Sequence, residues 1–529
     1  MPIATDLAVL SAAGPHPLSA YLSQVASGQA SIPDLIAVPA PAGAGTADPA
    51  LDELLPTGFA GAVAALRLVG QAGETGQTLV SIAGRPVRLL LLGVGDGSAR
   101  ALRLAGAELA RQVGPGDTAV TTVAVGVAGP GVQAFAEGAL LGGYEFRLTS
   151  GGPEPLGPGL IILLTPGPSD ADPTGAGSDD SGSDEVGVAV RQARLLAGAA
   201  ALARDLANQP AVRKDPQWLA DEAVRVNTGT PVRVRAWTET DLAASGFGGM
   251  LAVGGGSARP PRLIEMSYNP GGAAPHVVIV GKGITFDSGG LSIKHNDDMK
   301  FMKADMAGGG AVIAVMSALA GLDVRLRVTG LVAAAENMPS DTAYRPGDVI
   351  TQFGGTTVEV RNTDAEGRIV LADALAYAAA RLAPDYLIDI ATLTGAAREA
   401  LGRSHAAMYA TDEPLARALL AAGEASGDLL WQLPLADGYR PLIGSDVADL
   451  ANVARNGRRE AGSILAALYL REFTAGLRWA HLDISGPSRL VTPEGEPTIG
   501  ATGFGTRLLL HLLAGSGLAA TAAPAPSPA

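Results

Sequence analysis

The run HVVIVGKGITFDSGG (276–290) decides the fold of this 529-residue chain. Its first part, HVVIVGKGI (276–284), is a short apolar run rich in β-branched residues, which is typical of a buried strand. A helical pattern follows at 305–322, and a second apolar run, RVTGLVAAAEN, follows at 327–337. Strand–helix–strand order predicts a mainly parallel central sheet with helices on both faces.

The same alternation continues toward the C-terminus. VITQFGGTTVEVRN (349–362) contains two β-rich runs joined through Gly354-Gly355, which indicates a hairpin. IVLADALAYAAARLA (369–383) predicts a helix, and YLIDIATLTG (386–395) predicts a third buried strand. This half of the chain is therefore expected to form an α/β domain.

The N-terminal part carries its own α/β pattern. RPVRLLLLGVG (85–95) and GLIILLT (159–165) predict buried strands, and SARALRLAGAELARQV (98–113) predicts an amphipathic helix. We expect a smaller N-terminal α/β domain at 1–165 followed by a larger domain.

Two biased segments set the remaining boundaries. A Gly/Ser/Asp-rich stretch at 166–185 is almost free of apolar residues and predicts a linker. The larger domain is expected at 186–513, and the Ala/Pro-rich end at 514–529 predicts a disordered tail.

Composition excludes several classes of function. The chain has no cysteine, which rules out disulfides, a thiolate nucleophile and cysteine-based metal sites. Acidic residues outnumber basic ones, 52 to 38, so a nucleic-acid partner is not expected. The chain begins without a basic signal region and has no uninterrupted apolar run of about 18 residues, so we expect a cytoplasmic protein without a membrane span.

The basic residues are unevenly chosen. Only five are lysine (Lys214, Lys282, Lys294, Lys300 and Lys303), against 33 arginines, and four of the five fall between 282 and 303. A lysine amine can become neutral and bind a metal, whereas an arginine cannot be deprotonated in a protein. Chance clustering on a solvated helix remains an alternative for Lys300 and Lys303.

Polar clusters follow the predicted strands, where ligands of open α/β sheets bind. They supply four carboxylates: Asp287, Asp305, Asp364 and Glu366. Converging carboxylates would repel one another unless cations compensate them, and two bridged divalent ions ~3.5–4 Å apart would also activate water. The six histidines form no HExxH pair, so oxygen ligands would dominate. Each residue has a simpler reading: Asp305 as a helix cap, Asp364 and Glu366 as partners of a helix dipole, Lys282 as a partner of Asp287.

At these residues the sequence resembles the leucyl aminopeptidase (M17) family of two-metal exopeptidases. VGKGITFDSGGLSIK (280–294) and NTDAEGRIVLADAL (362–375) resemble the two signatures of the family, and the second is highly specific. The resemblance is strong from about 190 to 510. It implies that 186–513 is a catalytic metallopeptidase domain.

The resemblance implies a role for each matching residue. Lys282, Asp287, Asp305, Asp364 and Glu366 would bind two ions, with Asp287 and Glu366 bridging them. Lys294 would polarise the scissile carbonyl, and Arg368 would hold a bicarbonate-type base for the bridging water. Met302, Thr392 and Gly395 would line the substrate pocket. His295, where the family more often has proline, is expected to face solvent or a subunit contact.

The implied function is that of a manganese- or zinc-dependent aminopeptidase that removes leucine-like N-terminal residues from peptides. Members of the family assemble as hexamers. Two alternatives remain open: a two-metal hydrolase of another class, such as a phosphatase, and an added DNA-binding regulatory role, against which the lysine-free N-terminal part argues.

Overall fold

The computed structural model describes residues 5–12, 16–40, 48–148, 159–166, 181–272, 274–455, 460–492, 495–515 and 518. The chain divides into two compact units, the first formed by residues 1–201 with 492–498 and the second by 202–491 with 499–529. Most of the predicted linker at 166–185 and most of the predicted tail at 514–529 lie outside the described residues.

The first unit is built on a six-stranded sheet in the order β1-β6-β5-β2-β4-β3. All neighbouring strands are parallel except β3 and β4, which form an antiparallel hairpin. The predicted strands at 85–95 and 159–165 are β4 and β6. The strands are β1 (Thr5–Ala12), β2 (Leu35–Pro39), β3 (Thr75–Ile82), β4 (Arg85–Leu92), β5 (Thr118–Thr121) and β6 (Gly159–Pro166).

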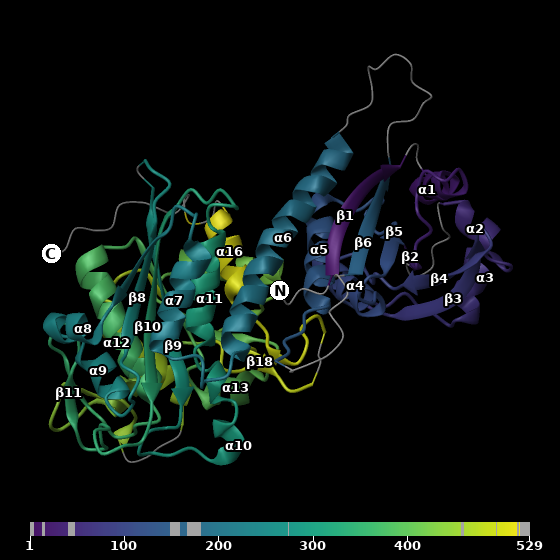
Figure 1. Ribbon diagram of the computed structural model, residues 1–529. Helices are drawn as coiled ribbons and strands as arrows, with labels where there is room; N and C mark the ends of the chain where they lie inside the picture. Colours follow the sequence, from purple (N-terminus) through teal and green to yellow (C-terminus); the bar gives the residue numbers. More distant parts are fainter. Residues whose placement is uncertain are drawn as a thin grey trace. The chain divides into compact units, whose positions relative to one another are not determined.

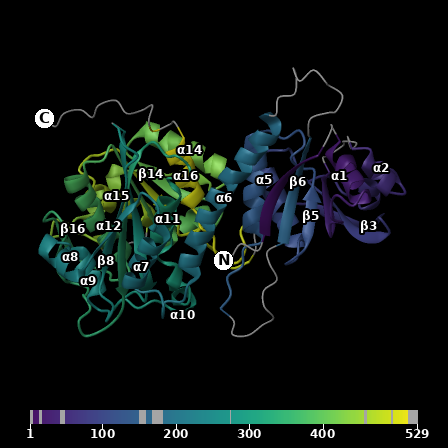
Figure 2. The same ribbon diagram turned by 45° about the horizontal axis from the view of Figure 1, so that its top comes forward.

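Helices cover both faces of this sheet, so the unit has three layers (Figure 2). One face packs against α4, α5 and α6, and the other against α1, α2 and α3. The predicted helix at 98–113 is α4, which Ser98 caps by accepting from the Ala101 N–H. The helices are α1 (Pro17–Ala26), α2 (Ala50–Leu54), α3 (Gly58–Ala65), α4 (Ala99–Gln112), α5 (Gly129–Gly142) and α6 (Ser181–Asn208).

The second unit is built on an eight-stranded mixed sheet in the order β15-β14-β17-β13-β9-β10-β8-β7. Its centre is parallel, because β9 pairs in parallel with β10 and β13, and β13 with β17. The strands are β7 (Arg233–Trp237), β8 (Arg262–Tyr268), β9 (His276–Asp287), β10 (Arg327–Asn337), β13 (Tyr386–Ala391), β14 (Ala406–Ala410), β15 (Leu430–Gln432) and β17 (Trp479–Asp483).

The central strand β9 is covered on both faces (Figure 1). Val278 and Val280 belong to the core that α12 closes, whereas Gly281, one pleat over, faces α11. The helices and helical turns of this unit are α7 (Pro216–Asn227), α8 (Glu239–Ser245), α9 (Gly248–Gly254), α10 (Asn296–Met299), η1 (Met302–Ala304), α11 (Ala307–Ala318), α12 (Glu366–Tyr377), η2 (Ala378–Leu382), α13 (Gly395–Leu401), α14 (Glu413–Ser426), η3 (Asp437–Ile443), α15 (Gly462–Arg471) and α16 (Thr506–Ala514).

Short strands form two small sheets beside the central one. The predicted hairpin at 349–362 is present, and its two glycines, Gly354 and Gly355, have φ of 90° and 100°, which the turn requires. The strands are β11 (Val349–Thr351), β12 (Thr357–Glu359), β16 (Leu450–Ala451), β18 (Arg489–Leu490) and β19 (Gly500–Ala501).

Glycines let α11 lie directly on the sheet. A Cβ at Gly308 would lie 2.1 Å from the carbonyl oxygen of Ile390, and one at Gly281 would lie 2.7 Å from the Cα of Gly309. Such distances leave no room for a side chain. The segment that precedes α11 is therefore held close to the end of β9.

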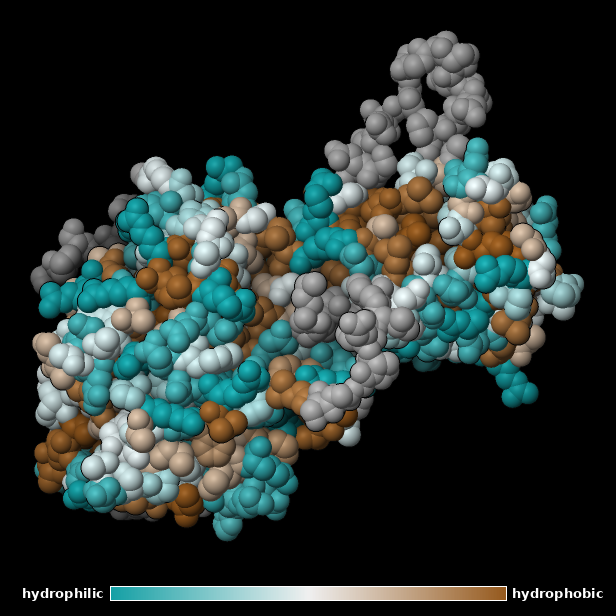
Figure 3. Space-filling model, in the orientation of Figure 1, coloured by the Kyte–Doolittle hydropathy of each residue, from teal (hydrophilic) through white to brown (hydrophobic). Residues whose placement is uncertain are grey.

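The α/β fold class predicted from the sequence is confirmed in both units. Among the described residues, Glu185–Asn208 of α6 is apolar and long enough to cross a membrane by length and composition, but 56% of its most apolar window is buried. Hydrophilic and apolar residues are interspersed on the visible face of the second unit (Figure 3).

Candidate active site

The end of β9 carries the first two predicted ligands, Lys282 and Asp287. Five positions separate them, so in a regular strand they would point to opposite faces. The pairing of β9 with β10 shifts register here: Ala335 faces Ile284, but the next residue, Glu336, faces Phe286. Thr285 is thus an extra residue, and this bulge brings Lys282 and Asp287 to the same face.

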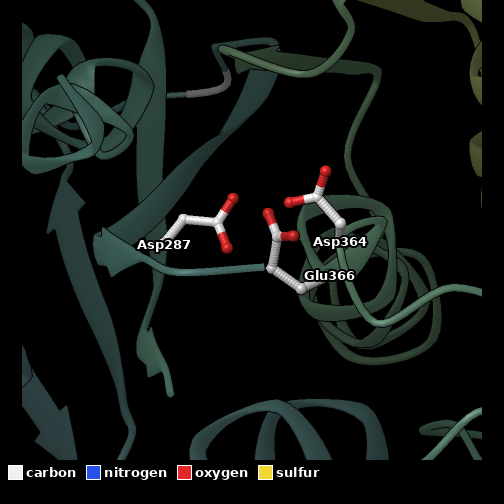
Figure 4. A group of neighbouring side chains, drawn as sticks. All are labelled: Asp287, Asp364 and Glu366. Carbon is white, nitrogen blue, oxygen red and sulfur yellow. The ribbon is translucent and has the colours of Figure 1, made fainter. Parts of the chain in front are cut away.

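Three further carboxylates meet this face from other segments. Asp305 directly follows η1, Asp364 precedes α12, and Glu366 is the first residue of α12. Figure 4 shows Asp287, Asp364 and Glu366 pointing toward one another, and one oxygen of each lies within 4.8 Å of the others. Asp287, Asp305 and Glu366 are buried, whereas Asp364 is half-buried.

Two lysines lie among these carboxylates. Lys282 Nζ is 2.8 Å from both Asp305 Oδ2 and Glu366 Oε1, and it donates to the carbonyl of Thr392 at 3.0 Å. Lys294 Nζ is 2.7 Å from Asp287 Oδ2 and also pairs with Asp364. Each ammonium group therefore bridges two carboxylates.

Burial and mutual repulsion dominate the electrostatics of the carboxylates. Burial, with the added charge of Glu366, raises the pKa of Asp287 and of Asp364 to about 7. Burial raises the pKa of Asp305 to about 6, with Lys282 opposing it. Burial also acts to raise the pKa of Glu366, but the two lysines outweigh it and lower that pKa.

The lysines show the complementary effect. Burial disfavours the charged amine of Lys282, but the neighbouring carboxylates, Asp305 first, outweigh it and raise its pKa. The pKa of Lys294 is raised in the same way, with Asp287 as the largest favourable contribution. Both amines are therefore charged unless a competing cation displaces the proton.

Two residues outside the predicted set, Asn337 and Thr363, support the end of β9 and the loop that follows it. Asn337, at the end of β10, is fully buried and donates through Nδ2 to Asp287 Oδ1 at 2.8 Å and to the carbonyl of Thr363 at 3.0 Å. Thr363 Oγ1 donates to the carbonyl of Gly289 at 2.7 Å. The available signal for Asn337 was its place at the end of a predicted strand, next in the sheet to β9.

The absence of a side chain at Gly367 leaves room for Lys282 to reach the carboxylates. A Cβ at Gly367 would lie 2.6 Å from Cε and 2.7 Å from Nζ of Lys282. The backbone of α12 thus packs against the lysine stem, and a larger residue at this position would collide with it.

The other residues predicted from the sequence lie at different distances from the carboxylates. Thr392 joins the centre, since its Oγ1 donates to Asp305 Oδ1 at 2.6 Å. Met302 begins η1, and its carbonyl accepts from the Asp305 N–H at 3.2 Å, while Gly395 is exposed at the start of α13. Arg368 is buried on α12 and donates through Nη1 to the carbonyl of Asn452 at 2.6 Å; within the described part of the chain its Nε has no hydrogen-bond partner. His295 is exposed.

Two other lysines hold the segment that leads into Asp305. Lys214 is fully buried, and its Nζ donates to the carbonyls of Leu206, Ala207 and Lys303 at 2.9, 3.0 and 2.5 Å. Lys303 Nζ donates to the carbonyl of Asn208 at 2.7 Å. The two amines thus cap the last carbonyls of α6, a favourable position for a cation, and tie this helix end to η1.

The donor set fits divalent cations. Four carboxylates face two ammonium groups, so when all four carboxylates are ionised two negative charges are left uncompensated in a largely buried site. Among the described residues, Glu366 Oε2 is buried without a hydrogen-bond partner, which is unfavourable unless a cation binds there. Oxygen ligands suit Mn²⁺, Mg²⁺ and Zn²⁺. An α/β fold with such a centre at the carboxyl end of its central strand is typical of metal-dependent hydrolases.

Comparisons with known proteins identify the family. Residues 201–510 match the model of the "Cytosol aminopeptidase family, catalytic domain". A "Probable cytosol aminopeptidase" of Syntrophotalea carbinolica is 42% identical over 460 residues, which are 83% of this chain and 89% of the relative. Another from Micrococcus luteus is 41% identical over 494 residues, covering 88% and 92%. The chain belongs to the cytosol aminopeptidase (M17) family of metallopeptidases.

Solved structures agree with this assignment. The "Bottromycin maturation enzyme BotP in complex with Mn" superposes with a TM-score of 0.78 at 36% identity, covering 91% of this chain and 99% of that protein. The likeness therefore includes both units of the chain.

Proposed function

We propose that the centre binds two divalent ions and hydrolyses the N-terminal peptide bond of peptides. Asp287 and Glu366 would bridge the ions, Lys282 and Asp305 would complete one site, and Asp364 would complete the other. The observation that carries this proposal is the convergence of all five side chains with Lys294, which leaves two negative charges uncompensated when the four carboxylates are ionised. BotP was solved in complex with Mn, which supports manganese as one candidate, with zinc as the other.

Lys282 would act as a ligand in its neutral form. Its amine already lies 2.8 Å from Asp305 and Glu366. Loss of one proton would therefore give it a free electron pair with which to bind a metal ion at the same place. The carboxylates favour the charged amine, so a cation would have to displace that proton.

Two further residues would assist the reaction. When bound, two divalent ions activate a water molecule and polarise the substrate carbonyl. Lys294 would remain charged, since its pKa is raised, and would stabilise the oxyanion that develops on the carbonyl. Arg368 would hold a bicarbonate-type anion through its Nε, which has no hydrogen-bond partner among the described residues, and that anion would accept a proton from the attacking water.

The proposed substrate preference rests on fewer contacts than the proposed metal ligands do. Met302, Thr392 and Gly395 would line the pocket for a leucine-like first residue, and two of them touch Asp305. We also propose a cytoplasmic location, in keeping with the word cytosol in the names of the relatives, and a hexameric assembly.

Paired substitutions of the two lysines test the proposal. Lys282→Arg cannot supply a neutral amine, so bound metal should fall by about one ion per chain. Lys294→Arg should retain its metal, while hydrolysis of leucine amide slows by somewhat less than the ~10²–10³-fold that loss of an oxyanion stabiliser costs. Lys300→Arg, at an exposed lysine paired with Asp297, is the control.

The readouts are metal content and turnover on leucine amide and on a phosphate monoester. Equal metal loss in Lys282→Arg and Lys294→Arg would show that the ligand role is misassigned. Turnover of the phosphate ester alone would favour the phosphatase alternative.

A further inference from the structure

Three arginines of the second unit form a cluster that the proposed reaction leaves unused. Arg398 lies on α13, Arg403 follows that helix, and Arg489 begins β18; all three are half-buried. Arg403 Nη1 donates to the backbone carbonyl of Arg489 at 2.8 Å. The guanidinium of Arg489 stacks on the ring of Phe301, 3.5 Å from its centroid. These three arginines are called the arginine cluster below.

Among the described residues, no carboxylate forms an ion pair with the arginine cluster. Burial, together with the charges of Arg403 and Arg398, lowers the pKa of Arg489 to about 10, and the charge of Asp298 opposes this shift. Other arginines of this acidic chain, such as Arg417 and Arg440, do have a glutamate partner.

Packing like charges without a counterion is unfavourable, and unfavourable electrostatics of this kind concentrate at binding sites. Phe301 stacks against one face of the Arg489 guanidinium, whose N–H groups make no hydrogen bond to any described residue. A planar guanidinium edge matches a carboxylate, to which it can donate two parallel hydrogen bonds.

Chain connections put the arginine cluster beside the proposed substrate pocket. Phe301 directly precedes Met302, whose carbonyl accepts from Asp305. Arg398 lies three residues after Gly395 on α13, which corresponds to about 4.5 Å along the helix axis. The cluster is thus attached to both segments that would form the pocket.

We propose that the arginine cluster binds a carboxylate of the peptide substrate, on the side that leaves after cleavage. The inference rests on the proposed aminopeptidase function, in which the free amine and first side chain occupy the metal centre and its pocket. A short peptide then extends away from the centre, and its terminal carboxylate or an acidic side chain reaches the cluster. The site would make the enzyme prefer short peptides that have a free C-terminal carboxylate or an acidic side chain near the C-terminus.

The test compares short substrates with and without a carboxylate. Leucine amide and Leu-Gly amide have no carboxylate, Leu-Gly has a terminal one, and Leu-Glu amide has one on the side chain. We expect the wild-type holoenzyme to show a lower KM for a carboxylate-bearing substrate than for its neutral counterpart. In Arg398→Gln/Arg489→Gln this advantage should fall by about tenfold, because a charge-assisted hydrogen bond is lost. Whether Leu-Gly or Leu-Glu amide loses more identifies the source of the carboxylate.

The controls distinguish failure of the arginine-cluster inference from failure of the proposed aminopeptidase function. Arg417→Gln, at an exposed arginine paired with Glu413, should leave every KM unchanged. Full turnover of leucine amide by the double variant shows that the fold and the metal centre are intact. Equal KM ratios in the wild type and the double variant would overturn the inference while leaving the aminopeptidase function in place. An altered molar mass in light scattering, with unchanged ratios, would assign the cluster to a subunit contact instead. Absence of leucine amide hydrolysis in the wild type would overturn both.

Discussion

Replacing Gly367 with alanine should separate metal binding from folding. The new methyl group would lie 2.6 Å from Cε of Lys282, whereas ordinary contacts begin at 3.4 Å. The lysine side chain must therefore move by about 0.8 Å, the difference between these two distances. Ligand distances in metal sites are held to within about 0.2 Å, so a shift of this size removes Lys282 from the site.

The cost to the fold should be small by comparison. Overpacking a buried position costs about 1–3 kcal/mol, and alanine in place of a helical glycine returns up to about 1 kcal/mol. We therefore expect the metal-free variant to lose about 0–2 kcal/mol of unfolding free energy. Affinity for the ion at the Lys282 side should fall more, by at least the 10–100-fold that loss of a supporting contact produces.

Manganese titration followed by calorimetry and urea unfolding of the metal-free protein measure the two effects. Gly198→Ala is a matched control, because this glycine also lies in a helix but a Cβ there meets no atom within 4 Å. It should gain stability, by up to about 1 kcal/mol, and bind as much manganese as the wild type does. A Gly367→Ala enzyme with two tightly bound ions and full turnover would refute the reasoning.

Three further predictions concern the same centre. Asp287→Asn should lose both ions and nearly all activity, since in the proposed arrangement this one carboxylate would bridge the two sites; metal analysis showing full occupancy would contradict the bridging role. Lys214→Met should destabilise the protein by about 1–3 kcal/mol in urea unfolding, because three carbonyls, two of them buried, lose their donor, and an unchanged midpoint would contradict this. Manganese affinity should fall as the pH decreases through about 7, because Asp287 and Asp364 then take up protons that the cation must displace; calorimetry in two buffers should show proton release, and an affinity that is flat between about pH 8 and 6 would contradict it.

Much of the fold could be predicted because its signals are local. The run at 276–284 contains the apolar part of β9, and Gly354-Gly355 marks the hairpin between β11 and β12. Boundaries were less predictable. The helix expected from 369 begins at Glu366, because its first turn carries the polar residues of the site rather than apolar ones.

The site shows where sequence reasoning ends. Residue types and strand ends were enough to select Lys282 and Asp287. However, they are five positions apart, an odd number, which would place them on opposite faces of a regular strand. The bulge at Thr285 that brings them to the same face depends on pairing with β10. Asn337 could not be selected either, because its role depends on which strand lies next to β9.

Because lysine is scarce, this protein can be labelled selectively at one lysine side chain. Lys214 and Lys282 are buried, Lys294 and Lys303 are engaged, and Lys300 is the exposed lysine of the five. A reagent that acylates amines therefore meets one accessible lysine side chain in the folded protein. That side chain lies 5.2 Å above the ring of Phe301, which also carries Arg489. A fluorophore attached at Lys300 would stand beside the arginine cluster and could report the arrival and departure of peptides without any engineered cysteine.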